Sequence, residues 1–444
     1  MARTRYIISD LHLGAGDYAD DFDQDAAFQD FLETISAQRS SELIINGDFI
    51  DFVAVTLERS SVKPFSRLGC TEQESLLKLE RVLEAHGESL QALRRFMERG
   101  HRLVLVPGNH DVDLFWPRVR DRLLEIWGNP DSDHFHFEST GVYREGGLYV
   151  EHGNQYYADS AFEDFTHPFL RDPKTGELRL ERSWSNCFLE YFANGMMSER
   201  NPFINNVRPI PNMVFLGIQD ESWWFKVAYG YKLLRFMTKV GFPPFKESRE
   251  LQRRKREGLL DVWGYSRKRV VDFISGRARV ELQGVEDAEA LSEEFPPEEE
   301  EAQAREGLLL DSLSTREDAL SVAARDHLLS DQGIDVVVFG HDHRYYSNEL
   351  QPSLGGKKGK YYINTGTWIP MLFLTRTRRQ LRWRDLADES LYQLLLTYAV
   401  VKRGLHGYHA TLRRLPPRRE GAEAAVRHPG RGIRIFRPGN REAL

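Results

Sequence analysis

The chain has 444 residues, of which 41% are hydrophobic and 29% are charged. Its formal net charge of -7 makes a nucleic-acid-binding surface driven by overall positive charge unexpected. The two cysteines, Cys70 and Cys187, are far apart in the sequence, so we expect neither a disulfide framework nor a zinc-thiolate site.

The first third of the chain alternates short apolar runs with amphipathic segments. Buried strands are predicted at 6–8, 43–45 and 103–106, and helical spacing of apolar residues predicts helices at 22–39 and 71–99. Residues 134–151 are expected to form two or three short strands around their glycines. Strands that alternate with helices in this way predict an α/β fold built from βαβ units.

The strand rhythm stops after about residue 155 and returns at residue 334. Apolar runs predict strands at 334–339, 361–363, 394–401 and 407–415. We therefore expect a core formed by 1–155 and 326–415. Residues 156–325 are expected to be a large, mostly helical insertion that forms a lid or substrate region, with a flexible acidic segment near 286–306. The Arg-rich tail at 416–444 is expected to be loosely ordered.

The N-terminal sequence MARTRYIISD contains no apolar segment of signal-peptide length. No other segment approaches the ~18 apolar residues of a membrane-spanning helix. We expect a cytoplasmic protein, and a peripheral contact with the inner membrane surface stays open as a second interpretation.

Residues of the types that bind metal ions directly follow five predicted strands. They are Asp10 and His12, Asp48, Asn109 with His110, His152, and the pair His341 and His343. Loops at the carboxyl ends of strands meet in space in an open α/β sheet. Each motif alone is more often a turn or a helix cap, but their joint occurrence indicates a metal site. Carboxylate, imidazole and amide donors together suit Mn, Fe, Zn or mixed pairs.

The order of these motifs, D-x-H, G-D, G-N-H-D, H and G-H-x-H, resembles the calcineurin-like metallophosphoesterase superfamily. The resemblance covers about 1–155 and 330–370, and it implies a four-layered αββα sandwich. It also implies how the ligands divide between two divalent metal ions. Asp10, His12 and His343 would hold the first, Asn109, His152 and His341 the second, and Asp48 would bridge them.

The same resemblance implies a metal-dependent phosphoric ester hydrolase, with Mn as the first choice of metal. A hydroxide that bridges the two metals would attack a phosphodiester, pyrophosphate or phosphomonoester. His110 would protonate the leaving oxygen and Asp51 would orient His110. A turn or helix cap is the alternative role for Asp51. Asp111 is expected to brace its loop from behind the ligands.

The opening S-D-L-H-L-G is most similar to the UDP-2,3-diacylglucosamine hydrolase-like branch, which includes enzymes that cleave a pyrophosphate in lipid A synthesis. Two features depart from those enzymes: His110 stands where they carry Arg, and the insertion between His152 and His341 is long. In addition, Phe52 replaces the Arg of the Ser/Thr protein phosphatase signature. The sequence therefore favours the branch, but neither that pathway role nor protein dephosphorylation.

Residues 220–245 combine many aromatic side chains, among them Trp223 and Trp224, with interleaved Lys and Arg. Such a helix can lie on a membrane surface or roof an acyl-chain pocket, or it can simply pack a lid onto the core. We expect a phosphorylated small-molecule or lipid-linked substrate, whose binding residues the sequence does not identify. Two alternatives stay open: a metal-dependent nuclease, which the net charge supports little, and a non-catalytic metal-binding scaffold.

Overall fold

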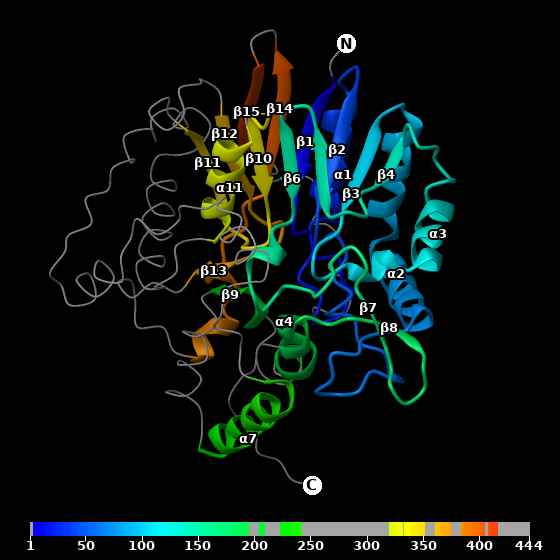
Figure 1. Cartoon of the computed structure of the whole chain (residues 1–444), viewed down its shortest axis with the longest axis vertical. Helices are drawn as coiled ribbons and strands as arrows, with labels where there is room; N and C mark the ends of the chain where they lie inside the picture. The colour runs from blue at the N-terminus through cyan, green and yellow to red at the C-terminus, as the bar shows by residue number, and fades with distance from the viewer. Residues whose placement is uncertain are drawn as a thin grey trace, which may run out of the picture.

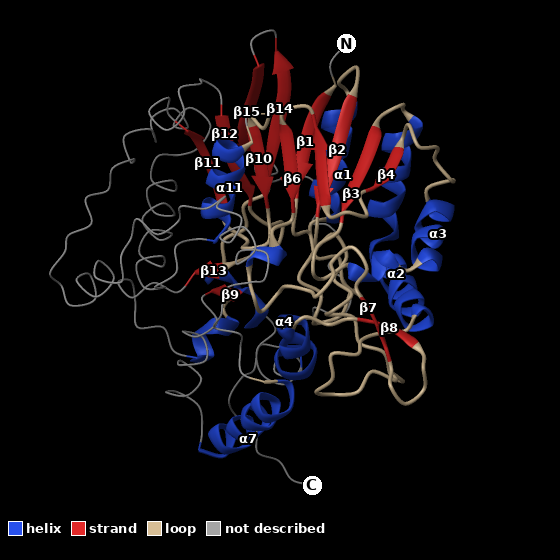
Figure 2. Ribbon diagram, in the orientation of Figure 1, coloured by secondary structure: helices blue, strands red, loops and turns tan. Residues whose placement is uncertain are grey.

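The computed structural model describes residues 3–194, 204–208, 223–241, 319–331, 333–350, 360–373, 383–404 and 407–415. Two β-sheets pack face to face, and helices cover the outer face of each (Figures 1 and 2). The four-layered αββα sandwich expected from the motif order is therefore confirmed.

The first sheet has six strands, and its central part is parallel. In spatial order they are β15 (Gly407–Arg414), β14 (Thr397–Gly404), β1 (Thr4–Ile8), β2 (Ser41–Asn46), β3 (Arg102–Val106) and β4 (Phe135–Phe137). Strands β1 to β4 run parallel, and β14 joins β1 in the antiparallel direction. The carboxyl ends of β1, β2 and β3 consequently lie at one edge of the sheet.

The second sheet has five strands. In spatial order they are β11 (Tyr345–Leu350), β12 (Lys360–Thr365), β10 (Val336–Phe339), β6 (Leu148–Glu151) and β5 (Val142–Glu145). The middle strand β10 is parallel to both β6 and β12. Every strand predicted from the sequence is present, and β11 is an additional strand of this sheet.

Both faces of the central strands are buried, which explains their continuous apolar runs. Side chains alternate along a strand, so neighbours point to opposite faces. Ile7 therefore packs between the two sheets, whereas Ile8 packs against the outer helices. In the same way Val336 faces the other sheet and Val337 faces the outer helix.

Four of the described helices lie in the two outer layers. They are α1 (Asp25–Ser36), α2 (Glu72–Glu98) and α3 (Pro117–Ile126) on the six-stranded sheet, and α11 (Ala319–Ser330) on the five-stranded sheet. Thr71 and Glu74 form a capping box that fixes the start of α2. The backbone of α2 is non-helical at His86, where φ is -120°, so the predicted helix has a kink that its periodicity does not indicate.

A further group of elements lies beyond the carboxyl ends of the strands, at the bottom of Figure 1. It comprises the hairpin β7 (Phe169–Arg171) and β8 (Leu178–Leu180), α4 (Trp184–Phe188), a π-helical turn (Leu189–Ala193), β9 (Val207–Arg208), α7 (Trp223–Val240) and β13 (Leu372–Phe373). Short 3-10 turns occupy Val112–Phe115, Asn154–Tyr156, Ile204–Asn206, Trp383–Ala387 and Glu389–Leu391.

An apolar cluster of its own joins α4, β9, α7 and β13, whereas the hairpin β7–β8 packs against the main core. Phe188 of α4, Phe236 of α7 and Leu372 of β13 are among its buried members. Much of the expected insertion, including the acidic segment near 286–306, lies outside the described residues, as does the tail at 416–444. None of the helices within the described residues is long and apolar enough to cross a membrane.

Candidate metal centre

The loops after β1 and β2 are joined to each other by backbone hydrogen bonds. The amide of Asp10 donates to the carbonyl of Gly47 at 3.1 Å, and that of His12 to the carbonyl of Asp48 at 2.9 Å. The amide of Asp51 donates to the carbonyl of Leu13 at 2.9 Å. These bonds extend the β1–β2 pairing past the end of the sheet and hold the two loops side by side.

The backbone of these loops is strained in a characteristic way. Within the described chain, seven non-glycine residues have positive φ, and five of them are expected ligands: Asp10, His12, Asp48, His341 and His343. Left-handed backbone is costly for such residues, and it concentrates at functional sites, where the surrounding structure holds it. Five expected ligands thus share a conformation that local preference alone would not select.

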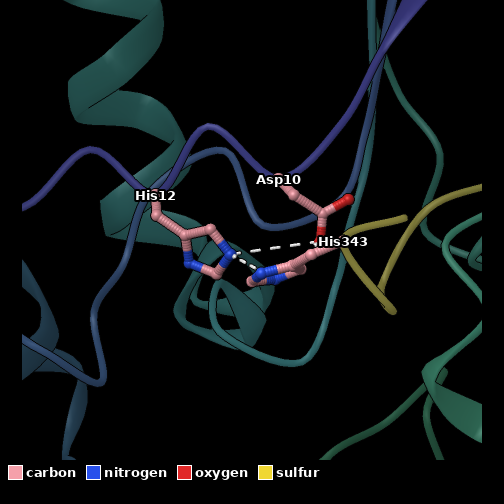
Figure 3. Close-up of side chains that lie close together, drawn as sticks. All are labelled: Asp10, His12 and His343. Carbon is pink, nitrogen blue, oxygen red and sulfur yellow. Dashed lines mark hydrogen bonds and ion pairs between the residues drawn. The ribbon is translucent and has the colours of Figure 1, made fainter. Parts of the chain in front are cut away.

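The first three expected ligands lie together at the ends of β1 and β10 (Figure 3). Nε2 of His343 is 3.2 Å from Nε2 of His12 and 3.4 Å from Oδ1 of Asp10. Nε2 of His12 is 4.0 Å from the same oxygen. All three side chains are buried, and their donor atoms face one another.

A second group forms next to the first. It joins Asp48, His152 and His341, whose candidate donor atoms all lie within 4.8 Å of one another. Oδ2 of Asp48 is 3.2 Å from Nε2 of His152 and 3.8 Å from Nε2 of His12. Asp48 therefore stands between the two groups, where a bridging ligand has to stand.

Each of three imidazoles uses Nδ1 for an outer contact and turns Nε2 toward the centre. Nδ1 of His152 donates to the carbonyl of Asn46 at 2.8 Å. Nδ1 of His12 donates to Oδ2 of Asp51 at 3.0 Å, and Nδ1 of His343 is 3.4 Å from Sδ of Met371. Contacts of this kind fix the tautomer and leave the Nε2 lone pair for a metal ion.

Three buried polar atoms of the expected second-metal residues make no hydrogen bond in this arrangement. They are Oδ1 of Asn109, Nε2 of His152 and Nδ1 of His341. A buried polar atom without a partner is costly, so each case needs an explanation. A divalent cation would satisfy all three, and their oxygen and nitrogen donors fit Mn, Fe or Zn.

Two motif glycines are required by close approach of the ligands. A Cβ at Gly47 would overlap the imidazole of His152, and one at Gly108 would overlap Oδ1 of Asp48. Gly47 also has a φ of +80°, which side chains disfavour. The G-D and G-N-H-D motifs thus contain glycine because a ligand side chain occupies the space that any larger residue would need.

The electrostatics favour an ionised Asp48 and neutral His341 and His343. Burial disfavours a charged carboxylate, yet His152 and His110 hold the pKa of Asp48 well below its usual value. Burial, followed by the charge of His152, lowers the pKa of His341, and burial followed by Arg208 lowers that of His343. Neutral imidazoles with a free lone pair are the form that binds metal ions. Burial also lowers the pKa values of His152 and His12, but Asp48 raises that of His152 to about 10 and Asp51 raises that of His12.

His110 does not belong to either ligand group, but it is held against them. Its amide donates to Oδ1 of Asp48 at 2.9 Å, and its Nδ1 lies 2.9 Å from Oδ1 of Asp51. Burial lowers the pKa of His110, but Asp51 and Asp48 together raise it to about 9. The side chain keeps partial exposure at the edge of the site, which suits a group that exchanges protons with a ligand.

The structure also defines supporting contacts. Asp111 accepts from the amides of Gly108 and Phe49, so the bracing role expected for it is confirmed. Nδ2 of Asn364 donates to the carbonyl of Gly340 at 3.1 Å, which ties the end of β12 to the loop of His341.

Three residues near the centre carry no sequence signal. Nδ2 of Asn186 in α4 donates to the carbonyl of Asn109 at 2.7 Å. Met371 contacts His343, and the charge of Arg208 acts on both His341 and His343. All three come from segments outside the five motifs, and only the folded chain brings them to the site.

Residues 4–204 match the model of the calcineurin-like phosphoesterase family. This range contains Asp10, His12, Asp48, Asn109 and His152, whereas His341 and His343 lie beyond it. No curated protein matches the chain. The match supports the superfamily and a metal-dependent phosphoesterase in general, and the narrower branch stays a prediction.

Proposed function

We propose that this chain, whose residues 4–204 match the calcineurin-like phosphoesterase family, hydrolyses a phosphoric ester at a dinuclear metal centre. The observation that carries the proposal is the pair of buried ligand groups that meet at Asp48. Asp10, His12 and His343 would hold one cation, and Asn109, His152 and His341 the other. Asp48 would contribute to both sites.

The donor set of the two sites consists of oxygen and nitrogen atoms, without a thiolate. Two divalent cations bound there would supply Lewis acidity, which lowers the pKa of water and neutralises charge on phosphoryl oxygens. Mn is our first choice, with Fe, Zn or a mixed pair as alternatives.

The protein groups around the cations would position the substrate and move its proton. His110 is the candidate general acid, because its raised pKa keeps it protonated at neutral pH. Asp51 would hold the ring of His110 through Nδ1, which leaves Nε2 to donate a proton to the leaving oxygen. Asp51 would at the same time keep His12 in the tautomer that presents Nε2 to a cation.

We further propose a small-molecule or lipid-linked phosphate as the substrate, reached through α7. Trp223, Val227, Tyr231 and Leu234 of this helix are 72%, 47%, 64% and 60% exposed. Their spacing of four, four and three residues puts them on one side of the helix. Phe236 on the opposite side is fully buried. A helix that buries one apolar face and exposes another can lie at a membrane surface, which suits a cytoplasmic protein with peripheral membrane contact.

The proposed activity is tested with generic phosphate esters. We expect the purified, Mn-loaded chain to cleave bis-p-nitrophenyl phosphate or p-nitrophenyl phosphate, and chelation to abolish the cleavage. Elemental analysis should find about two metal ions per chain. A chain that holds two metals but cleaves neither ester, nor any member of a panel of nucleotide sugars, phospholipids and cyclic nucleotides, would favour the scaffold alternative.

A further inference from the structure

A short strand pairing outside the two main sheets ties Arg208 to a segment that contacts the metal centre. Strand β9 pairs with β13 in parallel, so that Arg208 lies opposite Phe373. Met371, which directly precedes β13, contacts Nδ1 of His343 at 3.4 Å. Nδ2 of Asn206 donates to the carbonyl of Pro370 at 2.7 Å and fixes the pairing at this end. Arg208 is thereby anchored to the segment that touches His343.

Hydrogen bonds to described residues hold the guanidinium of Arg208 in place but involve only one of its nitrogen atoms. Its Nη1 donates to the carbonyls of Asn205 and Val207, at 2.6 and 3.2 Å. An arginine has five N–H donors in a planar fork. Within the described parts of the chain, Nε and Nη2 of Arg208 have no hydrogen-bond acceptor. One edge of the fork therefore fixes the side chain, and the other edge is available for an anion.

The charge of Arg208 acts on residues of both ligand groups. Its positive charge lowers the pKa of His343 and also that of His341. Burial lowers the pKa of Arg208 itself, while Asp21, Asp10 and Asp342 raise it and Arg344 lowers it. Among the described residues none of these carboxylates forms an ion pair with the guanidinium. Arg208 is thus a fixed cation without an ion-pair partner in the part of the chain that the structure describes.

We propose that Arg208 binds the phosphoryl group of the substrate, donating from Nε and Nη2 to its anionic oxygens. A planar guanidinium edge matches two oxygens of one phosphate, and such charged pairs are among the stronger hydrogen bonds. His110 is held at Asp51 and Asp48, whereas Arg208 is paired with the segment whose Met371 contacts His343, so the two residues would flank the phosphate from different loops. This assignment rests on the proposed function for its substrate class, since it makes Arg208 a specificity residue of that same site.

Binding of inorganic phosphate tests the assignment without turnover. Titration calorimetry with the full-length, Mn-loaded chain should show phosphate binding that weakens about 10- to 100-fold in Arg208→Gln, the range typical of a charged hydrogen bond. Arg208→Lys keeps the charge but loses the fork, and we expect a smaller loss of about fivefold or more. Arg235→Gln is the matched control, because Arg235 is an arginine of α7 that lies over the ring of Phe65. Its phosphate affinity should stay within about twofold of wild type.

Metal content and thermal unfolding of each variant are measured in parallel. If Arg208→Gln binds less metal or unfolds at a lower temperature than the wild type, the phosphate affinity of Arg208→Lys is used to decide. Phosphate affinity that is unchanged in the deciding variant, or absent from the wild type, overturns the assignment. The outcome for the proposed function is separate. A chain that binds phosphate through Arg208 but cleaves no ester would contradict the hydrolase and leave the phosphate site standing. If the wild type cleaves esters and Arg208→Gln binds phosphate equally well, the hydrolase proposal stands and the assignment of Arg208 is contradicted.

Discussion

Oδ1 of Asp51 lies 2.9 Å from Nδ1 of His110, and Oδ2 of the same carboxylate lies 3.0 Å from Nδ1 of His12. One side chain thus links the candidate acid to a candidate metal ligand. Burial raises the pKa of Asp51, but His110 and His12 have the larger effect and lower it well below its usual value. The carboxylate therefore stays ionised between them. This shared contact is why Asp51 is expected to affect both proton transfer and metal binding.

Replacing Asp51 by Asn should shift the pH dependence of hydrolysis. His110 donates only while protonated, so activity exists below its pKa and falls as pH rises through it. Asp51 is the main group that raises this pKa, and its removal should move the alkaline limb of the pH–rate profile to lower pH. We also expect turnover to fall about 10- to 100-fold, as for other outer partners of metal ligands. A variant with wild-type turnover and an unmoved alkaline limb would argue for a purely structural Asp51.

Replacing Asp48 by Asn should disable both metal sites, because its carboxylate stands between His12 and His152. We expect metal content to fall below about two per chain and turnover to drop by more than about 100-fold, beyond the loss for an outer-shell residue. Asp30→Asn on the exposed surface of α1 is the matched control and should change neither quantity. Normal turnover of the Asp48 variant would rule out the proposed arrangement.

Replacing Asn186 by Ala should weaken the second metal site without touching a ligand side chain. Asn186 fixes the backbone of Asn109 through a 2.7 Å hydrogen bond, and its loss frees that ligand to move. We expect a metal affinity lower by about tenfold, measured by titration of the metal-depleted chain. His110→Ala is the comparison, because it should lower turnover while both metals stay bound. Equal metal affinity in wild type and Asn186→Ala would remove α4 from the site.

The sequence predicts those parts of the centre that depend on local patterns. Asp10, Asp48 and His152 each stand within two residues of the end of an apolar strand, and parallel strands bring their carboxyl ends to one edge. The contact from Asn186 to Asn109 has no such pattern, since it joins residues 77 positions apart through the packing of α4. Arg208 was missed for the same reason, because its strand is only two residues long.

Two features of the fold could also not be predicted from the sequence. The segment Tyr345–Leu350 lacks the alternation of apolar and polar residues that is typical of a strand. It forms a strand because it pairs with β12. The kink of α2 at His86 lies inside a segment with regular helical spacing. The His86 side chain contacts Asp20 and Asp25, which lie outside α2, at the point where its backbone departs from helical geometry.

Stability should depend on pH through His86. Its Nε2 lies 2.8 Å from Asp20 and its Nδ1 lies 3.0 Å from Asp25, so the ring joins α2 to the start of α1 and to the loop behind His12. Burial lowers the pKa of His86, but the two carboxylates raise it from 6.5 to about 9. A raised pKa contributes stability fully below about pH 6.5, and the contribution is lost as pH rises to about 9.

The shift corresponds to roughly 3 kcal/mol in the free energy of unfolding. Urea unfolding at pH 6 and pH 9.5 should show a decrease of this order in the wild type and a smaller one in His86→Gln. The variant also loses the charge at pH 6, so the two proteins should converge in stability at high pH. A wild-type stability that is equal at both pH values would show that the ring is not held as an imidazolium.

The exposed side of α7 should determine binding to lipid surfaces. Transfer of a large apolar side chain from water into the lipid interface is favourable by up to about 1.5–3 kcal/mol when burial is complete. Trp223 and Leu234 are 72% and 60% exposed, so replacing either by Ser should not disturb the core around Phe236. We expect each substitution to weaken sedimentation with anionic phospholipid vesicles about tenfold, a size that partial burial can supply.

The matched control for α7 is Tyr18→Ser, which removes an aromatic side chain that is 45% exposed in the loop after β1. It should leave vesicle binding unchanged. Cleavage of p-nitrophenyl phosphate should be equal in all these variants, since α7 contributes no expected ligand, whereas cleavage of a vesicle-borne phospholipid should fall with vesicle affinity. If Trp223→Ser and Leu234→Ser bind vesicles like the wild type, the exposed stripe does not serve lipid contact. Loss of both activities to the same extent would instead mean that α7 acts by packing over the centre.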